Sequence, residues 1–254
     1  MSKSKGNILD PLEIIDKYGL DPLRFYLLKE VSFGNDGNIS KEKLENCINS
    51  DLANNYGNLC QRVISFTEKN FDLNIPDEIN LMDQDKLILG KFNKNFDILI
   101  NSIDKQDINF YVKFLMETLF SSNKYFNDEA PWNKKDDKTR LNTIVYVSLE
   151  LIRRISIIIY PIMPKSSLNA LKIFNIKENE IDFKSIKDDN FLKNINKLDI
   201  FKIFIVTLFL YFAWSVKQTS IITSSAIFLY LIIKKDRLII FFISIFLFFV
   251  ILNF

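Results

Sequence analysis

The strongest constraint on the fold is a series of amphipathic helical segments between residues 40 and 176. The first begins at Ser40, a good helix cap, and reaches about Phe71. Its apolar residues recur at steps of three, four and seven: Leu44, Ile48, Leu52, Leu59, Val63 and Phe66. This spacing places them on one face of a helix. After a loop around Pro76, in NIPDEI, the same period returns, so the segment predicts helices and no sheet.

Two further long helices follow from this pattern. One runs roughly from Asp83 to Ser102, with inward residues Leu87, Phe92, Phe96, Leu99 and Ile103. The next is capped by Asp107 and carries Ile108, Val112, Leu115, Leu119 and Phe120. It ends in the run NKYFNDEAPW, where Pro131 closes the helical region and Trp132 follows directly.

The bundle is completed by a fourth helix and a short fifth one. Asp137 opens the fourth, which extends to Tyr160 and is broken by PIMP, and SSLNALKIFN forms the fifth. Amphipathic helices joined by short links predict an all-α, antiparallel bundle over residues 40–176. Residues 177–199 are charged and weakly patterned, so we interpret them as a linker.

Residues 1–39 have a different organisation. The opening MSKSKGN predicts a polar, mobile loop, and lysines on such a loop can reach a polyphosphate as point charges. Two short helices come next, because each starts with an Asp-Pro pair suited to a cap and a first turn: Asp10 with Pro11, and Asp21 with Pro22. Gly19 ends the first of them.

The run MSKSKGN…DPLEIIDKYGLDPLRFYLL…FGNDG resembles the KMSKS loop and stem-contact region of class I aminoacyl-tRNA synthetases, most closely the methionyl-tRNA synthetases. The resemblance extends from Met1 to about residue 190. It implies that Lys3 is catalytic and contacts the phosphates of ATP, supplied with Mg²⁺, while Ser2 and Ser4 bind ATP by positioning the loop. It also implies that the helices of this region join a catalytic half to residues 40–176.

Three residues outside this loop are implied to bind the anticodon of the methionine tRNA. Asn58 and Arg62 lie four residues apart on the first long helix, and in DLANNYGNLCQR they match a family pair of an asparagine and an arginine. By themselves they are typical of a solvated polar face. Trp132, in EAPW, matches the family tryptophan that stacks on an anticodon base, although a tryptophan after a proline is more often a core residue.

Composition limits the function further. The net charge is +2, so an RNA contact must be local. The chain has no histidine, and therefore no HIGH signature, and its cysteines, Cys47 and Cys60, have no metal-ligand spacing. We expect no zinc ligands in the chain and reduced, buried thiols. The KMSKS motif normally begins with a lysine before Met1, so we expect a fragment whose N-terminal catalytic half is missing and which is inactive alone.

Residues 200–254 are almost wholly apolar, and two interpretations of them remain open. One is a transmembrane hairpin with Lys234, Lys235 and Arg237 as its cytoplasmic cluster, although the apolar runs barely reach the ~17–20 residues of a span. The other, which we favour, is a reading-frame shift near residue 198. The resemblance implies a cytoplasmic enzyme, whereas a hairpin would add a membrane as partner.

Other functions compete with the methionine-tRNA ligase. Leucyl, valyl and cysteinyl enzymes share the Lys/Ser loop and a helical anticodon-binding domain, but the FGNDG loop and the EAPW ending favour the methionyl enzyme. A rival from another class is a non-catalytic, membrane-anchored helical protein that binds RNA.

Overall fold

The structure is a computed structural model that describes residues 10–31, 37 and 39–199. The ATP-loop residues Ser2, Lys3 and Ser4 and the apolar segment 200–254 lie outside this range, so the predictions made for them stay predictions. Among the helices of the described part, none is both long and apolar enough to cross a bilayer.

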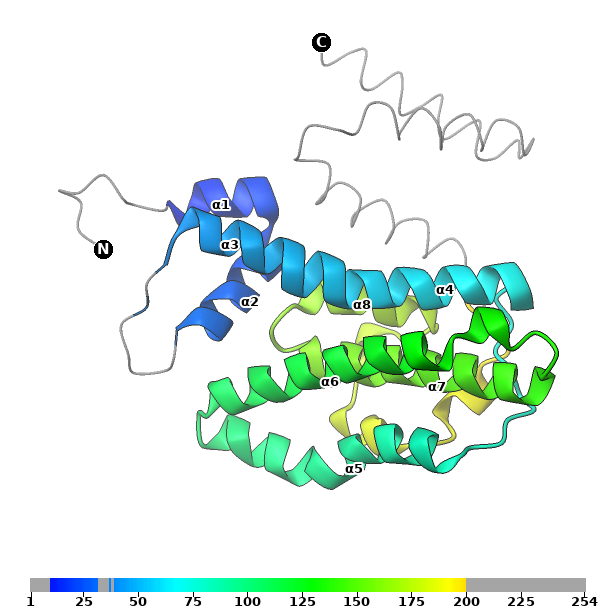
Figure 1. Ribbon diagram of the computed structural model, residues 1–254. Coiled ribbons are helices and arrows are strands. Elements are labelled where there is room, and N and C mark those ends of the chain that lie inside the picture. Colours follow the sequence, from blue (N-terminus) through cyan, green and yellow to red (C-terminus); the bar gives the residue numbers. More distant parts are fainter. Residues whose placement is uncertain (1–9, 32–36, 38, 200–254) are drawn as a thin grey trace, which may run out of the picture. The chain divides into compact units, whose positions relative to one another are not determined.

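Helices are the regular secondary structure of the described residues, joined by loops, and one isolated antiparallel bridge pairs Asn74 with Lys197. The all-α prediction is therefore confirmed for these residues (Figure 1). The α-helices are α1 (Pro11–Tyr18), α2 (Leu20–Glu30), α3 (Lys41–Cys47), α4 (Asn58–Phe71), α5 (Asp83–Asp104), α6 (Ile108–Glu129), α7 (Lys138–Ile159) and α8 (Pro164–Ile173). Single-turn or slightly longer 3₁₀ helices cover Pro131–Asn133, Glu178–Glu180, Phe183–Lys187 and Phe191–Asn194.

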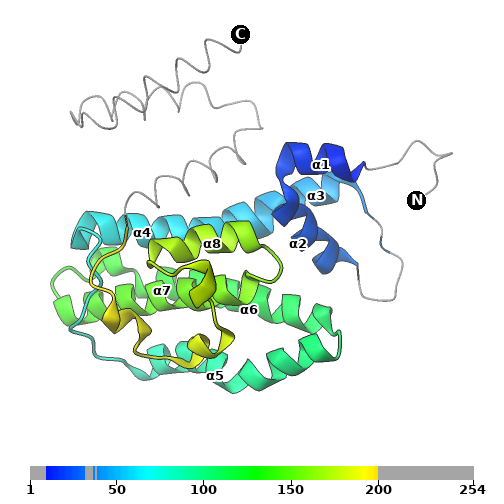
Figure 2. The same cartoon turned by 180° about the vertical axis from the view of Figure 1, so that it is seen from behind.

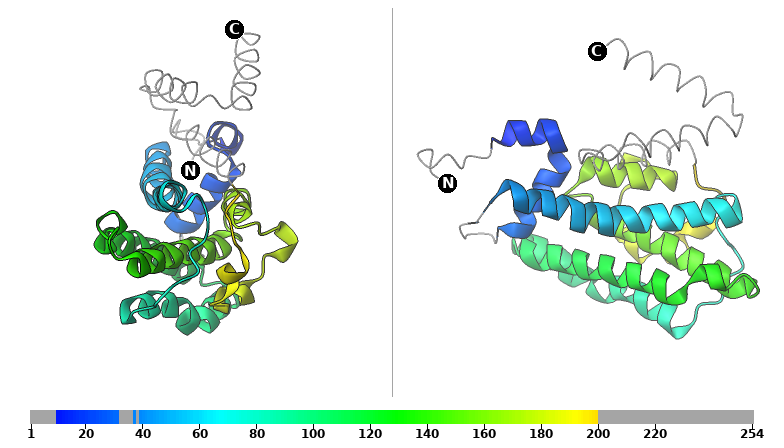
Figure 3. Two further views of the ribbon diagram at one scale, coloured as in Figure 1. Left: turned by 90° about the vertical axis from the view of Figure 1, so that its right-hand side faces the viewer. Right: turned by 45° about the horizontal axis from the view of Figure 1, so that its top comes forward.

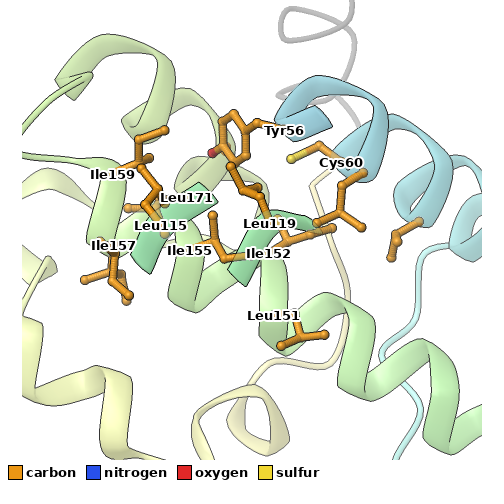
Figure 4. Close-up of a cluster of buried hydrophobic side chains, with 14 of the residues drawn as sticks. Tyr56, Cys60, Leu115, Leu119, Leu151, Ile152, Ile155, Ile157, Ile159 and Leu171 are labelled. Carbon is orange, nitrogen blue, oxygen red and sulfur yellow. The ribbon is translucent and has the colours of Figure 1, made fainter. Parts of the chain in front are cut away.

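Helix α7 is the centre of the bundle and is buried on nearly all its faces. It packs against α4, α5, α6 and α8, which surround it in Figures 1 and 2 and in the end-on view of Figure 3. Figure 4 shows Ile152 and Ile155 of α7 among Leu119 of α6, Leu171 of α8 and Tyr56, which lies between α3 and α4. A helix that is buried on nearly all its faces must be enclosed by its neighbours, and the four helices around α7 do this.

Four helices begin at the caps that the sequence predicts. The side chains of Asp10, Ser40, Asp107 and Asp137 accept hydrogen bonds from backbone N–H groups two or three residues ahead, at 2.8, 3.2, 3.0 and 3.0 Å. These bonds satisfy N–H groups that have no partner inside the helix. Gly19 ends α1 with a φ of 87°, a conformation that glycine adopts without strain.

The predicted cap at Asp21 is wrong. Asp21 lies inside the first turn of α2 and is buried, and its carboxylate accepts a hydrogen bond of 2.6 Å from the backbone N–H of Ser166. Ser166 lies in the first turn of α8, so Asp21 caps a helix that starts 143 residues later, at Pro164. Together with the bond from Arg24 to the carbonyl of Pro161, at 2.7 Å, it fastens α2 to the bundle.

The predicted helix from Ser40 to Phe71 is continuous, but its middle is wound differently. Ile48–Gly57 is a π-helix between α3 and α4, and the N–H of Asn58 reaches the carbonyl of Ala53, five residues back. Asn55 nevertheless lies on the same side as Arg62, because Asn55 contacts Asn123 and Arg62 contacts Asn127, one turn further along α6. It is held against α6, where its side chain accepts a hydrogen bond of 2.7 Å from Asn123.

Three residues predicted to face inward are exposed. Leu87, Ile103 and Phe120 have 63%, 38% and 67% of their surface accessible. On α5 the buried positions beside Leu87 are Ile88 and Leu89. With 3.6 residues per turn, neighbouring positions of a helix can each align into a row that could face the core. On α5 the row of Ile88 and Leu89 faces the core, and the row of Leu87 does not.

Residues 177–199 pack on the bundle, although their sequence suggests an open linker. Ile186, Leu192 and Leu198 are buried. Two buried arginines of α7 hold the segment: Arg153 donates to the carbonyls of Ser185 and Asp188, and Arg154 donates to the Asp189 carboxylate at 2.6 Å. Glu150, also buried, binds both arginines and balances part of their charge.

Candidate functional site

Helix α4 presents Asn58 and Arg62 on the same face, one turn apart, as the sequence predicts. Both side chains are half-buried. The amide of Asn58 makes no hydrogen bond with any residue that the structure describes. Arg62 forms no ion pair within that same range; its Nη2 donates to the uncharged Asn127 at 2.6 Å. The site therefore offers a free amide and a guanidinium whose charge is not neutralised.

Trp132 lies beside Arg62, although 70 positions separate them in the sequence. The guanidinium carbon of Arg62 is 5.3 Å from the ring centre of Phe126 and 5.9 Å from that of Trp132. The rings of Phe126 and Trp132 meet edge to face at 6.0 Å, and Phe66 packs edge to face on Phe126 at 6.2 Å. Cation–π and aromatic contacts thus join α4, α6 and the loop after α6 into one cluster.

Trp132 remains 43% exposed, so it is not the core residue that its neighbour Pro131 would suggest. Helix α6 ends at Glu129, Ala130 adopts a left-handed conformation with φ of 41°, and the buried Pro131 starts a 3₁₀ turn that carries Trp132. Such a conformation is uncommon for a residue other than glycine, so its surroundings must hold it in place.

Below this turn lies a buried ionic network. Arg140 of α7 binds Asp85 of α5 through two hydrogen bonds, of 2.6 and 3.1 Å, and Tyr125 donates to the same carboxylate at 2.6 Å. Burial opposes ionisation of Asp85, but the bonds from Arg140, Tyr125 and the Met82 backbone outweigh it and lower the pKa of this carboxyl. The network ties α5 to the end of α6 and the start of α7.

Two residues of the cluster were not predicted from the sequence. Phe126 looks like any core aromatic of α6, and it is buried; what distinguishes it is contact with both Arg62 and Trp132. Asn127 is exposed, and its side-chain oxygen orients the Arg62 guanidinium by accepting a hydrogen bond from it. Both belong to NKYFNDEAPW, so the signal that pointed to Trp132 also contained them.

The described residues contain no group of three or more His, Cys, Asp or Glu side chains placed to hold a metal ion. Cys47 and Cys60 are free thiols, as expected, and burial raises the pKa of each to about 12. At neutral pH both therefore remain protonated and serve as small apolar residues.

The cluster combines an exposed aromatic face with an amide and a guanidinium beside it. Such a set can stack on one unpaired base and donate hydrogen bonds to the edge of another, the usual way in which proteins read single-stranded RNA loops. The sequence that forms this helical bundle is that of a class I aminoacyl-tRNA synthetase. The family model described as "tRNA synthetases class I (M)" matches residues 1–64.

The particular family follows from the rest of the chain. The model described as "Anticodon binding domain of methionyl tRNA ligase" matches residues 75–208. The chain therefore belongs to the methionyl-tRNA synthetase family.

Individual relatives agree with this assignment. The Methionine--tRNA ligase of Brucella suis biovar 1 is 35% identical over 187 residues, which are 73% of this chain and 36% of that protein. The enzyme of the same name from Rickettsia conorii is 37% identical over 197 residues, covering 74% and 38%. The Mycobacterium tuberculosis methionyl-tRNA synthetase, solved in complex with methionyl-adenylate, superposes with a TM-score of 0.70 at 34% identity, over 74% of this chain and 38% of that one. The chain thus spans little more than a third of these relatives.

Proposed function

We propose that this chain supplies the ATP-phosphate loop and the anticodon-binding bundle of a methionine-tRNA ligase. The reaction would be ATP-dependent activation of methionine and its transfer to the methionine tRNA. Lys3 would stabilise charge that develops on the ATP phosphates, with Ser2 and Ser4 positioning the loop and Mg²⁺ accompanying the nucleotide. Catalysis would need the segment with the amino-acid pocket and the HIGH signature, for which this histidine-free sequence offers no candidate.

In this proposal Asn58, Arg62 and Trp132 bind the anticodon. The observation that carries it is the meeting of Arg62 and Trp132 around Phe126, from segments 70 positions apart. The Trp132 ring is exposed enough to receive a base, and the guanidinium next to it has no carboxylate partner among the described residues.

The test is a titration of the full chain with an RNA hairpin that carries the CAU anticodon and with one that carries a scrambled triplet. Trp132→Ala should weaken CAU binding about fivefold to a hundredfold, since base stacking contributes ~1–3 kcal/mol per base. Arg62→Ala should reduce the preference for CAU over the scrambled loop, because it removes a base-edge contact along with the charge.

Lys69 provides a matched control, since it is an exposed cation in the last turn of the same helix α4. Lys69→Ala should weaken both hairpins to the same small extent. Equal affinity of the unmutated chain for the two hairpins would mean that the site does not read the anticodon.

A further inference from the structure

The side chain of Glu129 connects the buried ionic network to the turn that carries Trp132. Its carboxylate accepts hydrogen bonds from Nε of Arg140, at 3.1 Å, and from the amide of Gln84, and it forms an ion pair with Nη2 of Arg140 at 2.7 Å. Its side chain is 14% exposed, whereas Asp85 on the other side of Arg140 is fully buried. Glu129 is thus the outer carboxylate of a pair that shares one guanidinium.

The next three residues show why this anchor matters. Glu129 is the last residue of α6, Ala130 is left-handed, and Pro131 and Trp132 form the 3₁₀ turn, with Asn133 N–H bonded to the carbonyl of Ala130 at 2.9 Å. A left-handed alanine persists only when its neighbours fix the backbone on both sides. Pro131, buried, fixes one side; the doubly held carboxylate of Glu129 fixes the other.

The direction of the Trp132 ring follows from the same anchor. Phe126, which meets the ring edge to face, lies one helical turn before Glu129 on α6. If Glu129 lost its hold, α6 could fray back to Phe126, and the ring would lose both its backbone support and its aromatic neighbour. We propose that Glu129, held by Arg140, is a positioning residue that fixes Trp132 for stacking on an anticodon base. This inference depends on the function proposed above.

The charge of Glu129 makes the inference testable. RNA is an anion, so removing a carboxylate near the site should by itself strengthen binding. A positioning role predicts the opposite result for Glu129→Gln. The matched control is Asp128→Asn, one residue earlier, which removes the same charge from an exposed side chain with no partner among the described residues.

The experiment measures binding of the CAU hairpin to the full chain, well below its melting temperature, in a Trp214→Phe background. The sequence has two tryptophans, so Trp132 is then the sole intrinsic fluorophore of its kind. We expect Glu129→Gln to weaken binding about threefold to thirtyfold, less than loss of the ring, and to increase quenching of Trp132 by acrylamide. Asp128→Asn should bind as tightly as the background or more tightly.

A double-mutant cycle separates positioning from a general loss of structure. Glu129→Gln should have almost no further effect on affinity once Trp132 is alanine, because it acts through that ring. Gln84→Ala is a milder variant, because it removes the second donor to Glu129 and leaves the Asp85–Arg140 pair intact. It should also weaken binding of the CAU hairpin. It replaces Glu129→Gln if that variant does not fold.

Either of two results would overturn the inference: Glu129→Gln and Gln84→Ala binding as tightly as Asp128→Asn, or a Glu129→Gln effect that adds in full to that of Trp132→Ala. Both differ from failure of the proposed function, in which the background protein itself does not distinguish CAU from the scrambled triplet.

Discussion

Removing one partner of the buried pair Asp85–Arg140 should destabilise this bundle strongly. We consider the substitution Asp85→Asn, which keeps the size of the side chain and removes its charge. The carboxylate accepts two bonds from Arg140, one from Tyr125 and one from the Met82 backbone at 2.8 Å. An amide has one acceptor oxygen for these four donors, and Arg140, only 5% exposed, would retain Glu129 as its single anionic partner.

Breaking a buried ion pair from one side costs ~3–5 kcal/mol when the remaining charge has no partner, and since Glu129 still balances Arg140 we expect the lower end, ~3 kcal/mol. For a domain of about 190 residues, each 1 kcal/mol lowers the melting temperature by ~2–4 °C, so the expected loss is ~6–12 °C. Thermal melting followed by circular dichroism at 222 nm measures it. The control is Asp83→Asn, two residues earlier in the exposed first turn of α5, which should cost less than ~1 kcal/mol.

The pH dependence of stability has a fixed sign in this case. The folded-state pKa of Asp85 is lowered, so its contribution is complete above the unfolded-state pKa of ~3.9 and is lost as the pH falls through the folded-state pKa. The difference in melting temperature between the unmutated protein and Asp85→Asn should therefore shrink below about pH 4. A loss for Asp85→Asn no larger than that for Asp83→Asn, or a difference that grows on acidification, would refute the reasoning.

Three further outcomes are expected. Asp21→Ala should lower the free energy of unfolding by ~1–2 kcal/mol, because it removes the cap of α8, whereas Asp16→Ala on exposed α1 should stay within ~0.5 kcal/mol; equal effects would contradict the tertiary cap. A chain ending at residue 199 should melt cooperatively as a helical domain and be ~2–4 kcal/mol more stable than one ending at 195, which loses the buried Leu198 and its bond to Leu73; equal urea midpoints would argue against this. The 254-residue chain alone should show no methionine-dependent pyrophosphate exchange, and with a complementing catalytic segment Lys3→Ala should slow activation strongly while RNA binding is unchanged; exchange by the chain alone would contradict the proposal.

The helices could be predicted because their signals are local. Caps such as Ser40 and Asp137 bond to N–H groups two or three residues away, and apolar rows repeat within a turn or two. Asp21 shows the limit of local signals. An Asp-Pro pair predicts a cap for the helix that it starts, but the Asp21 carboxylate accepts its hydrogen bond from Ser166 of α8. Nothing in the neighbouring sequence could reveal a partner that only the packing of α2 on α8 supplies.

The packing of the segment 177–199 on the bundle was not predicted, for a related reason. Adjacent arginines such as Arg153 and Arg154 usually indicate a solvent-facing row, and a charged, weakly periodic stretch usually indicates a linker. In the structure both arginines are buried and bind residues of the segment 177–199. The burial of the arginines and the packing of this segment therefore depend on each other, and neither could be predicted from its own local sequence. In the candidate site, family resemblance supplied Arg62 and Trp132, but the packing around Phe126 needed three-dimensional information.

The π-helix at Ile48–Gly57 has a consequence for changes in chain length. A π-turn holds one more residue than an α-turn between hydrogen-bonded partners, so it can lose a residue by tightening to α geometry. A one-residue deletion there should leave α3 and α4 in register with their neighbours. The same deletion between Asn58 and Arg62 would swing everything beyond it by ~100° and turn the guanidinium away from Phe126. The π-helix before the candidate site can therefore absorb the loss of one residue while α4 keeps its face.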